Sequence, residues 1–318
     1  MRLIIRADAS ASVGTGHVMR SSTIAAEFLK LGHAVCYAGS IDPMSLILER
    51  FQELSIPYPV LDPVGFESNH ENDILLIDSY SVTPSDPFIA RERWFKLCSI
   101  SDSATPKYNV DLSIKPSLSQ RFELDNGFRT LSGPNYVLLR NSIVKTQPRD
   151  PNDSTPLRIL IAGGGSDPSG FCNEVTKALR ELPDDFTADI FSDNIDLAHQ
   201  SDPRIRIHKV SLLLDEFAKT ADLALTLASS LSIEFIAREI PVGIACAFEN
   251  QRRGFNEMVS SEFAAPIGSR NNSGEWVIDL GMLKKLIGSS FLRNNLRLKI
   301  SGLIDMNGPK RVAQEILK

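Results

Sequence analysis

The strongest constraint on the fold is a pattern that occurs twice: a short apolar run, a glycine-containing loop, and then apolar residues at helical spacing. In the first copy the run at 3–5 precedes a loop that contains Gly14 and Gly16. In the second copy the run at 157–161 precedes three consecutive glycines at 163–165. Short β-rich runs that alternate with helical patterns are typical of parallel sheets covered by helices. The sequence therefore predicts an α/β chain of doubly wound domains.

The length of the chain predicts two such domains. At 318 residues it exceeds the usual size of a domain with one core. Residues 145–156 contain three prolines and few apolar side chains, which is typical of a linker. We expect an N-terminal domain at 1–147, a linker at 148–155 and a C-terminal domain at 156–318. The last helix, at roughly 309–317, is able to pack back on the N-terminal domain.

Charge and hydropathy exclude several kinds of partner. The formal net charge of −5 argues against a broad basic surface for nucleic acid or for acidic membranes. No apolar run approaches the roughly 18 residues that cross a bilayer, and Arg6 and Asp8 interrupt the first run. The four cysteines form no CxxC motif and mostly end apolar runs, as buried thiols do in a reducing compartment. We expect a cytoplasmic protein that neither binds nucleic acid nor inserts into a membrane.

The first glycine loop places a histidine where a ligand can bind. His17 falls in the first turn of the helix that follows the first strand. The first N–H groups of a helix lack partners within it and can hold an anion such as a diphosphate. Gly14 and Gly16 have no Cβ, so ligand atoms can approach the backbone closely. The alternative is a histidine that only makes local hydrogen bonds near the helix start.

Two further segments support a ligand site. The apolar strand at 73–78 ends at Asp78, and ligands gather at the carboxyl ends of parallel strands, so 78–81 should lie near the crevice of His17. The serine-rich turn at 228–232 again follows a strand and begins a helix, which makes it a second candidate anion site. Two α/β domains that meet at a cleft suit a substrate with a nucleotide at one end and a reacting group at the other. A nucleotide sugar fits that description.

Other ligand classes lose support because their motifs are incomplete. A dinucleotide fold would need glycine or alanine at Met19 and an acidic residue at the end of the next strand, near Ala38. Neither glycine loop has the lysine and hydroxyl residue of a P-loop. The sequence contains no HExxH motif, and no GxSxG motif with a downstream aspartate and histidine. NAD binding, ATP hydrolysis, metal-dependent hydrolysis and serine esterase chemistry are therefore disfavoured.

Several motifs, taken in chain order, resemble a known family. They are Ala7-Asp8-x-Ser10, Gly14-Thr-Gly16-His17-Val-Met-Arg20, Leu76-Ile-Asp78-x-Tyr80, Tyr136-Val-Leu-Leu-Arg140, the Gly163-Gly-Gly-Ser-Asp-Pro loop and Phe248-Glu-Asn250-Gln251. Together they are similar to the UDP-sugar hydrolases of the pseudaminic acid pathway. That family includes the spore-coat polysaccharide protein SpsG and is related to the MurG-like glycosyltransferases. The resemblance covers most of the chain, and its G-T-G-H-V-M-R block is fairly specific.

The resemblance implies a GT-B fold, in which two Rossmann-like domains face a cleft. It implies metal-independent hydrolysis of a UDP-linked 2,4-diacetamido-2,4,6-trideoxyhexose, without a cofactor and with inversion at the anomeric carbon. The products would be UDP and a free sugar for the biosynthesis of nonulosonic acids of the pseudaminic type, which serves flagellin glycosylation and polysaccharide biosynthesis. Other enzymes of that pathway would be its candidate protein partners.

The resemblance also implies roles for particular residues. His17 falls on the catalytic histidine of the family, and Tyr80 and Asn250 fall on positions implicated around the reacting sugar. The loop and helix that hold uridine diphosphate in related enzymes correspond to Ser230, Ile233 and Glu234. The other substrate-binding residues that it implies are Gly14, Gly16, Gly164 and Gln251. Without the resemblance, Tyr80 is a loop-rim residue, Asn250 a turn former and Glu234 a solvated helix residue.

The reaction can run with a single base. A UDP leaving group is a stable anion and needs no strong general acid, so one base that deprotonates the attacking water is enough. A helix N-terminus disfavours imidazolium, which would help to keep His17 neutral. Ser79 stands where these hydrolases often have histidine, and Ser81 where glycine is frequent, so the identity of the sugar stays open. A GT-B glycosyltransferase with a nucleotide-sugar donor and a non-catalytic nucleotide-sugar-binding protein remain as alternatives.

Overall fold

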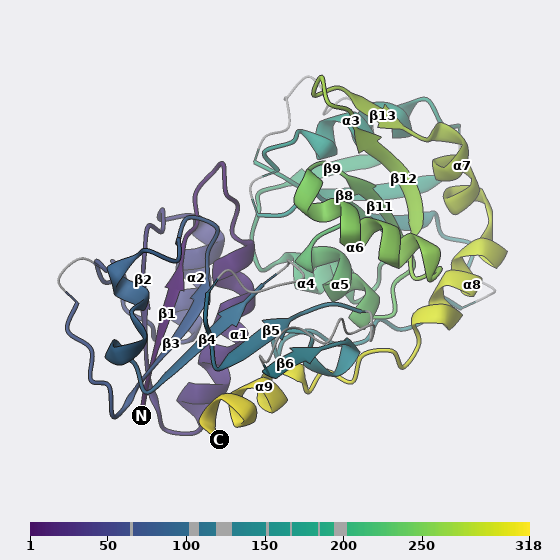
Figure 1. The fold of residues 1–318 in the computed structure, drawn as a ribbon. Helices are drawn as coiled ribbons and strands as arrows, with labels where there is room; N and C mark the ends of the chain where they lie inside the picture. Colours follow the sequence, from purple (N-terminus) through teal and green to yellow (C-terminus); the bar gives the residue numbers. More distant parts are fainter. Residues whose placement is uncertain are drawn as a thin grey trace. The chain divides into compact units, whose positions relative to one another are not determined.

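Figure 1 shows a computed structural model of the chain. It describes residues 1–63, 66–101, 108–118, 129–150, 153–165, 167–183, 185–193 and 202–318. The chain divides into two compact α/β units, and each is described by itself. Unit 1 consists of residues 1–141 together with 305–318, and unit 2 consists of residues 142–304.

Unit 1 contains a parallel sheet whose described strands run in the order β2-β1-β3-β4-β5-β6. After β1 the chain forms β2 on one side of it, and it then returns to form β3 on the other side, followed by β4, β5 and β6. Ligands bind outside the carboxyl ends of the strands at such a reversal, so the β1/β3 pair marks a candidate site. The strands are β1 (Arg2–Ala7), β2 (Ala34–Ala38), β3 (Asp73–Asp78), β4 (Lys96–Ile100), β5 (Leu112–Lys115) and β6 (Arg129–Ser132).

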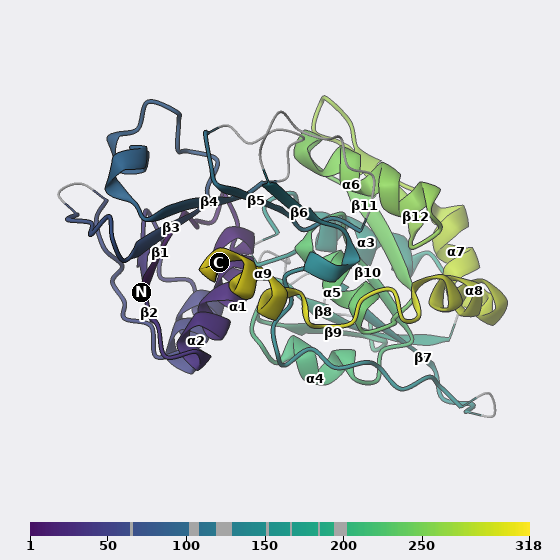
Figure 2. The same cartoon turned by 60° about the horizontal axis from the view of Figure 1, so that its bottom comes forward.

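Helices cover one face of this sheet, and Figure 2 shows them together on that side. They are α1 (Gly16–Lys30), α2 (Ser45–Glu53) and α9 (Gly308–Leu317). The apolar side chains of α1 that recur at helical spacing pack against alternate residues of β1, β3 and β4 in the core. The other face is covered by a segment with the short 3₁₀ helices Pro87–Ile89 and Arg91–Arg93, where Phe88 and Trp94 are buried. A third such turn, Pro134–Tyr136, contacts α9.

Unit 2 contains a second sheet, with its described strands in the order β13-β12-β11-β10-β7-β8-β9. All neighbours pair in parallel except the β12–β13 hairpin, which includes the polar stretch 268–275. The strand order reverses between β7 and β10. The strands are β7 (Leu157–Ala162), β8 (Phe186–Phe191), β9 (Ile205–His208), β10 (Leu223–Leu227), β11 (Val242–Cys246), β12 (Ala265–Arg270) and β13 (Trp276–Ile278). The helices are α3 (Phe171–Arg180), α4 (Leu214–Ala218), α5 (Ser230–Ala237), α6 (Glu249–Ser260), α7 (Leu280–Gly288) and α8 (Ser290–Ile300).

The boundary between the units falls at 141/142, earlier than the boundary at 147 that the proline-rich composition predicts. The N–H of Thr146 donates to the carbonyl of Arg238 at 2.7 Å, and the Arg149 guanidinium donates to Asp222 at 3.0 Å. These contacts join Thr146, at the end of the expected N-terminal domain, and Arg149, in the expected linker, to unit 2; residues 151 and 152 of that linker lie outside the described residues. The last helix, α9, belongs to unit 1.

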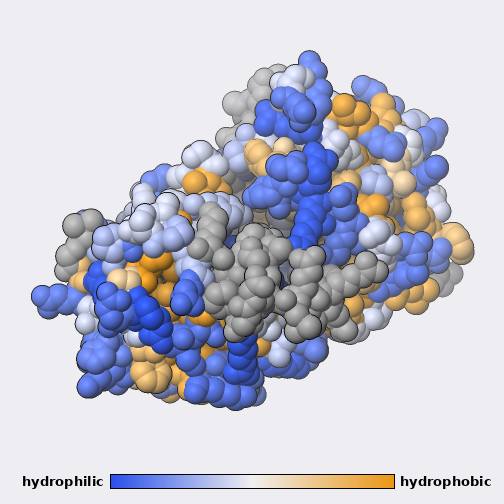
Figure 3. Space-filling model, viewed as in Figure 1, coloured by the Kyte–Doolittle hydropathy of each residue, from blue (hydrophilic) through white to orange (hydrophobic). Residues whose placement is uncertain are grey.

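The surface of the described residues mixes polar and apolar side chains (Figure 3). On α8, Phe291 and Leu298 are each 75% exposed, and they lie two helical turns apart. None of the helices within the described ranges is both long enough and apolar enough to cross a bilayer. The four cysteines are all present as free thiols.

Candidate active site

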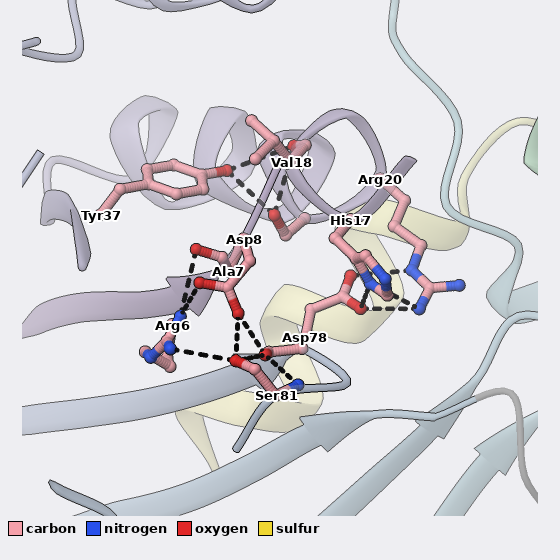
Figure 4. Close-up of polar contacts among 11 residues, drawn as sticks. Arg6, Ala7, Asp8, His17, Val18, Arg20, Tyr37, Asp78 and Ser81 are labelled. Atoms are coloured by element: carbon pink, nitrogen blue, oxygen red, sulfur yellow. Dashed lines mark hydrogen bonds and ion pairs between the residues drawn. The ribbon is translucent and has the colours of Figure 1, made fainter. Parts of the chain in front are cut away.

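A histidine and an aspartate meet at the β1/β3 reversal of unit 1 (Figure 4). His17 is the second residue of α1, and its ring is buried with 6% exposure. Its Nδ1 lies 2.6 Å from Oδ1 of Asp78, the fully buried last residue of β3. The two come together because Ala7 at the end of β1 pairs in register with Asp78, so the loop that follows β1 passes the end of β3.

Arg20 completes this cluster from the next turn of α1. Its Nε donates to Asp78 Oδ2 at 2.7 Å and its Nη2 donates to Oδ1 at 2.6 Å, which is a bidentate fork on the carboxylate. Because a carboxylate that faces a guanidinium accepts hydrogen bonds, we assign the proton of His17 to Nδ1, which donates it to Asp78; Arg20 Nη2 lies farther from Nδ1, at 3.3 Å. That tautomer leaves the lone pair of His17 on Nε2, where it can take a proton. The sequence places Asp78 near His17, but gives no role to Arg20.

Tyr80 packs against the same histidine. The two rings meet edge to face, with centroids 4.4 Å apart and planes at 85°. Tyr80 is 49% exposed, so it stands between the buried histidine and solvent. A pocket of about 440 Å³, open solvent at its mouth included, lies here within unit 1. Its lining consists of His17, Arg20, Ile77, Asp78, Ser79, Tyr80, Ser99, Ile100, Ser101 and Tyr108.

A second carboxylate, Asp8, lies beside this pocket at the end of β1 (Figure 4). The Arg6 Nη1 donates to its Oδ1 at 2.5 Å, and the hydroxyls of Ser79 and Ser81 donate to its Oδ2 at 2.5 and 2.6 Å. Burial alone would raise the pKa of Asp8. The hydrogen bonds from Arg6, the two serines and the Ser40 N–H outweigh that effect and lower the pKa from 3.8 to about 2. The sequence did not predict this cluster, although Asp8 follows β1 and the two serines follow the adjacent strand β3.

The two glycines of the first loop differ in their backbone. Gly14 has φ of +84°, a conformation that favours glycine, and its N–H donates to Ser10 at 2.8 Å. Gly16 begins α1 without a positive φ. A Cβ at either position would meet no atom within 4 Å, so both backbones are open on that side. Their role as substrate-binding residues stays a prediction.

The predicted residues of unit 2 lie along one edge of its sheet. Gly164 follows β7, Ser230 begins α5 after β10, and Asn250 lies in the first turn of α6 after β11. These three strands are neighbours in the sheet, and the reversal of strand order lies between β7 and β10. Gln251 holds the loop after β11, because its Oε1 accepts the Ala247 N–H at 2.9 Å. The remaining predicted residues are on α5: Ile233 and Glu234.

The N-terminus of α3 is occupied by an aspartate. The helix begins at Phe171, three residues after the proline of the glycine loop. Asp167 is buried, and its carboxylate accepts the N–H groups of Phe171 and Cys172 at 3.0 and 2.9 Å. A Cβ at Gly163 would lie 2.5 Å from the Asp167 carboxyl carbon, so glycine there makes room for the cap. The N-terminus of α3 is therefore occupied by a side chain of the protein itself.

Comparisons with known proteins address the fold. No protein-family model matches the chain. It is 26% identical over 285 residues to the uncharacterized protein MJ1062 of Methanocaldococcus jannaschii, a match that covers 81% of this chain and 58% of that protein. The chain thus spans little more than half the length of this curated relative.

Solved structures of glycosyltransferases share the fold of the chain. MurG from Acinetobacter baumannii has a TM-score of 0.64 and 14% sequence identity, and the match covers 99% of both chains. The spinosyn forosaminyltransferase SpnP has a TM-score of 0.64 and 13% identity over the full length of both chains. The spinosyn rhamnosyltransferase SpnG, complexed with thymidine diphosphate, has a TM-score of 0.62 and 12% identity, also over the full length of both chains. The chain therefore has the GT-B fold. Within that class its structural neighbours include the MurG-like glycosyltransferases.

Proposed function

We propose that the chain is an enzyme that binds a nucleoside diphosphate sugar and cleaves the bond between the anomeric carbon and the diphosphate oxygen. The observation that carries the proposal is the buried His17–Asp78 pair, 2.6 Å apart, in the lining of a pocket at the strand reversal of a GT-B unit. Aspartate that accepts from Nδ1 orients the ring and leaves Nε2 as a base. Because Arg20 donates to both oxygens of the carboxylate, this pair keeps its geometry before substrate binds.

The reaction is a single displacement. His17 Nε2 takes the proton of the attacking oxygen as that oxygen bonds to the anomeric carbon, and the bond to the diphosphate breaks with inversion. The leaving nucleoside diphosphate departs as an anion, so no acid residue needs to protonate it. Tyr80 in unit 1 and Asn250 in unit 2 are the proposed sugar-side residues.

The diphosphate is proposed to bind at the start of α5 in unit 2. Ser229 and Ser232 form a capping box there, and Ser230 is the first residue of the helix. The helix N-terminus favours an anion by its backbone dipoles. Ile233, Glu234, Gln251 and the loop at Gly164 belong to the same sheet edge and are proposed to contact the nucleotide.

Water is the first candidate for the attacking oxygen. The G-T-G-H-V-M-R block and the other motifs that resemble the UDP-sugar hydrolases support this choice. The substrate would then be a UDP-linked 2,4-diacetamido-2,4,6-trideoxyhexose, and the free sugar would feed nonulosonic acid biosynthesis. The second candidate is an acceptor hydroxyl, as in a glycosyltransferase, and the names of the solved neighbours favour it. The same base serves either nucleophile.

A sugar-nucleotide panel in H₂¹⁸O separates these functions. The full chain is incubated with UDP-, TDP-, GDP- and CMP-sugars, with EDTA, with and without acceptor alcohols, and followed by NMR and mass spectrometry. Hydrolysis is expected to release UDP and to place ¹⁸O on the anomeric carbon of the sugar. Label in UDP would instead show cleavage of a phosphorus–oxygen bond, and the proposed attack would be wrong.

Variants of two histidines make the test specific. His17→Gln is expected to abolish turnover, whereas His33→Ala is expected to keep it, because His33 follows the other end of α1, where its ring contacts Phe28. Nucleotide release only in the presence of an acceptor would establish a glycosyltransferase. If calorimetry detects binding of a nucleotide sugar and no turnover is found, the chain is a non-catalytic binding protein.

A further inference from the structure

The two residues that flank Tyr80 are both anchored to one carboxylate oxygen. Ser79 Oγ and Ser81 Oγ donate to Asp8 Oδ2 at 2.5 and 2.6 Å, and the N–H of Ser81 donates to Ser79 Oγ at 3.1 Å. The loop after β3 therefore closes around the end of the Asp8 side chain (Figure 4). Tyr80, between the two serines, places its ring 4.4 Å from that of His17.

The other oxygen of Asp8 is held from two further segments. Arg6 Nη1 donates to Oδ1 at 2.5 Å from β1, and the N–H of Ser40 donates to it at 2.9 Å from the loop after β2. Gly39 lets this guanidinium approach, because a Cβ there would lie 2.5 Å from Arg6 Nη1 and 2.1 Å from the Ala7 carbonyl oxygen. Asp8 is thus fixed by β1 and by the loops that follow β2 and β3, while the lining of the His17 pocket does not include it.

We infer that Asp8 is a positioning residue, which acts through Ser79 and Ser81 to hold the Tyr80 ring against His17. The inference deepens the proposed function, on whose assignment of His17 as the base it rests. A base loses efficiency when its ring departs from the productive geometry, and displacements of about 1 Å can cost about 100-fold in rate. A half-exposed tyrosine on a loop keeps a fixed edge-to-face contact only if the loop backbone is itself held.

Asp73 provides a matched control. It begins the strand that Asp78 ends, it is also buried, and it accepts from Arg2 Nη2 at 2.6 Å and from the Asn69 N–H at 2.7 Å. Asp73→Asn therefore removes a comparable buried acceptor from the same sheet, at the opposite end of the strand from His17. A change that only weakens the fold should have the same effect in both variants.

The test compares Asp8→Asn, the double variant Ser79→Ala/Ser81→Ala, Tyr80→Leu and Asp73→Asn in the full chain. The chain contains five histidines, and isotope labelling of histidine with a His17→Gln reference identifies the His17 ring signals by NMR. Asp8→Asn and the double serine variant are expected to move these signals toward their positions in Tyr80→Leu. Asp73→Asn is expected to leave them in place.

Turnover is the second measurement. Asp8→Asn and the double serine variant are expected to lower kcat by about 10- to 100-fold, and Asp73→Asn is expected to stay near the wild-type value. Unchanged His17 signals in the double serine variant, or equal movement in Asp73→Asn, would overturn the inference. If Asp8→Asn does not fold, the double serine variant decides. If the signals move as expected but wild type turns over no sugar nucleotide, the positioning role stands and the proposed reaction is wrong.

Discussion

The Asp8 cluster makes a pH-dependent contribution to the stability of unit 1 that can be calculated from the structure. The pKa of Asp8 is lowered from 3.8 to about 2 by hydrogen bonds that outweigh its burial. A folded-state pKa below the unfolded value stabilises the fold at every pH above 3.8. This stabilisation is lost as the pH falls from 3.8 through about 2. At about 1.4 kcal/mol per pKa unit, the ionised carboxylate contributes about 2 kcal/mol near neutral pH.

The perturbation is Asp8→Asn, and the assay must report on unit 1 alone. The chain has two tryptophans, Trp94 in unit 1 and Trp276 in unit 2. A Trp276→Phe background leaves buried Trp94, whose Nε1 donates to Phe88 O at 2.8 Å, as the reporter. Urea unfolding at pH 7, 5, 4 and 3 then gives the free energy of unfolding with and without the Asp8 carboxylate.

The expected result is a difference between the two proteins that is constant from pH 7 to pH 5. It should fall by about half, or about 1 kcal/mol, by pH 3, because Asp8 then becomes protonated in the unfolded chain more readily than in the folded one. Asp305, whose pKa is lowered to about 2 through its hydrogen bonds with Arg311, titrates in both proteins and cancels in the difference. A difference that stays constant down to pH 3 would refute the reasoning, since Asp8 would then not titrate differently in the two states.

Three further predictions concern activity and binding. His17→Gln should lower kcat by about 10²- to 10⁴-fold, the contribution of a general base, while calorimetry finds the affinity for UDP unchanged; undiminished kcat would contradict the assignment. Asp78→Asn should lower kcat by at least about 10²-fold, because the asparagine amide no longer fixes the Nδ1–H tautomer of His17. Measuring kcat as a function of pH checks this prediction. Ser230→Glu should weaken UDP binding by at least about 10-fold, because it places a carboxylate at the start of α5, while Ser290→Glu, at the exposed start of α8, should not.

The sequence predicts the fold and part of the site in unit 1, but not all of the contacts within that site. Hydrophobic periodicity predicts the strand–loop–helix units, and the rule that ligands meet at the carboxyl ends of strands predicts that His17 and Asp78 are close. The partners of Arg20 and Asp8 could not be predicted, because they depend on the register between β1 and β3, strands separated by more than 60 residues. The start of unit 2 was missed for the same reason: Arg149 meets Asp222, 73 residues away, while proline content is a local signal.

The two helix starts that follow glycine- or serine-rich turns in unit 2 differ in what they offer an anion. At α3 the Asp167 carboxylate accepts two of the backbone N–H groups, and burial raises the pKa of this group, although its hydrogen bonds oppose that shift. A diphosphate there would have to displace a buried acceptor. At α5 the cap is a pair of neutral serine hydroxyls, so no carboxylate of the cap repels an incoming anion. The three glycines before α3 are the clearer ligand-binding signal in the sequence. Electrostatics nevertheless favour the start of α5, after β10 at the strand reversal, as the site of the diphosphate.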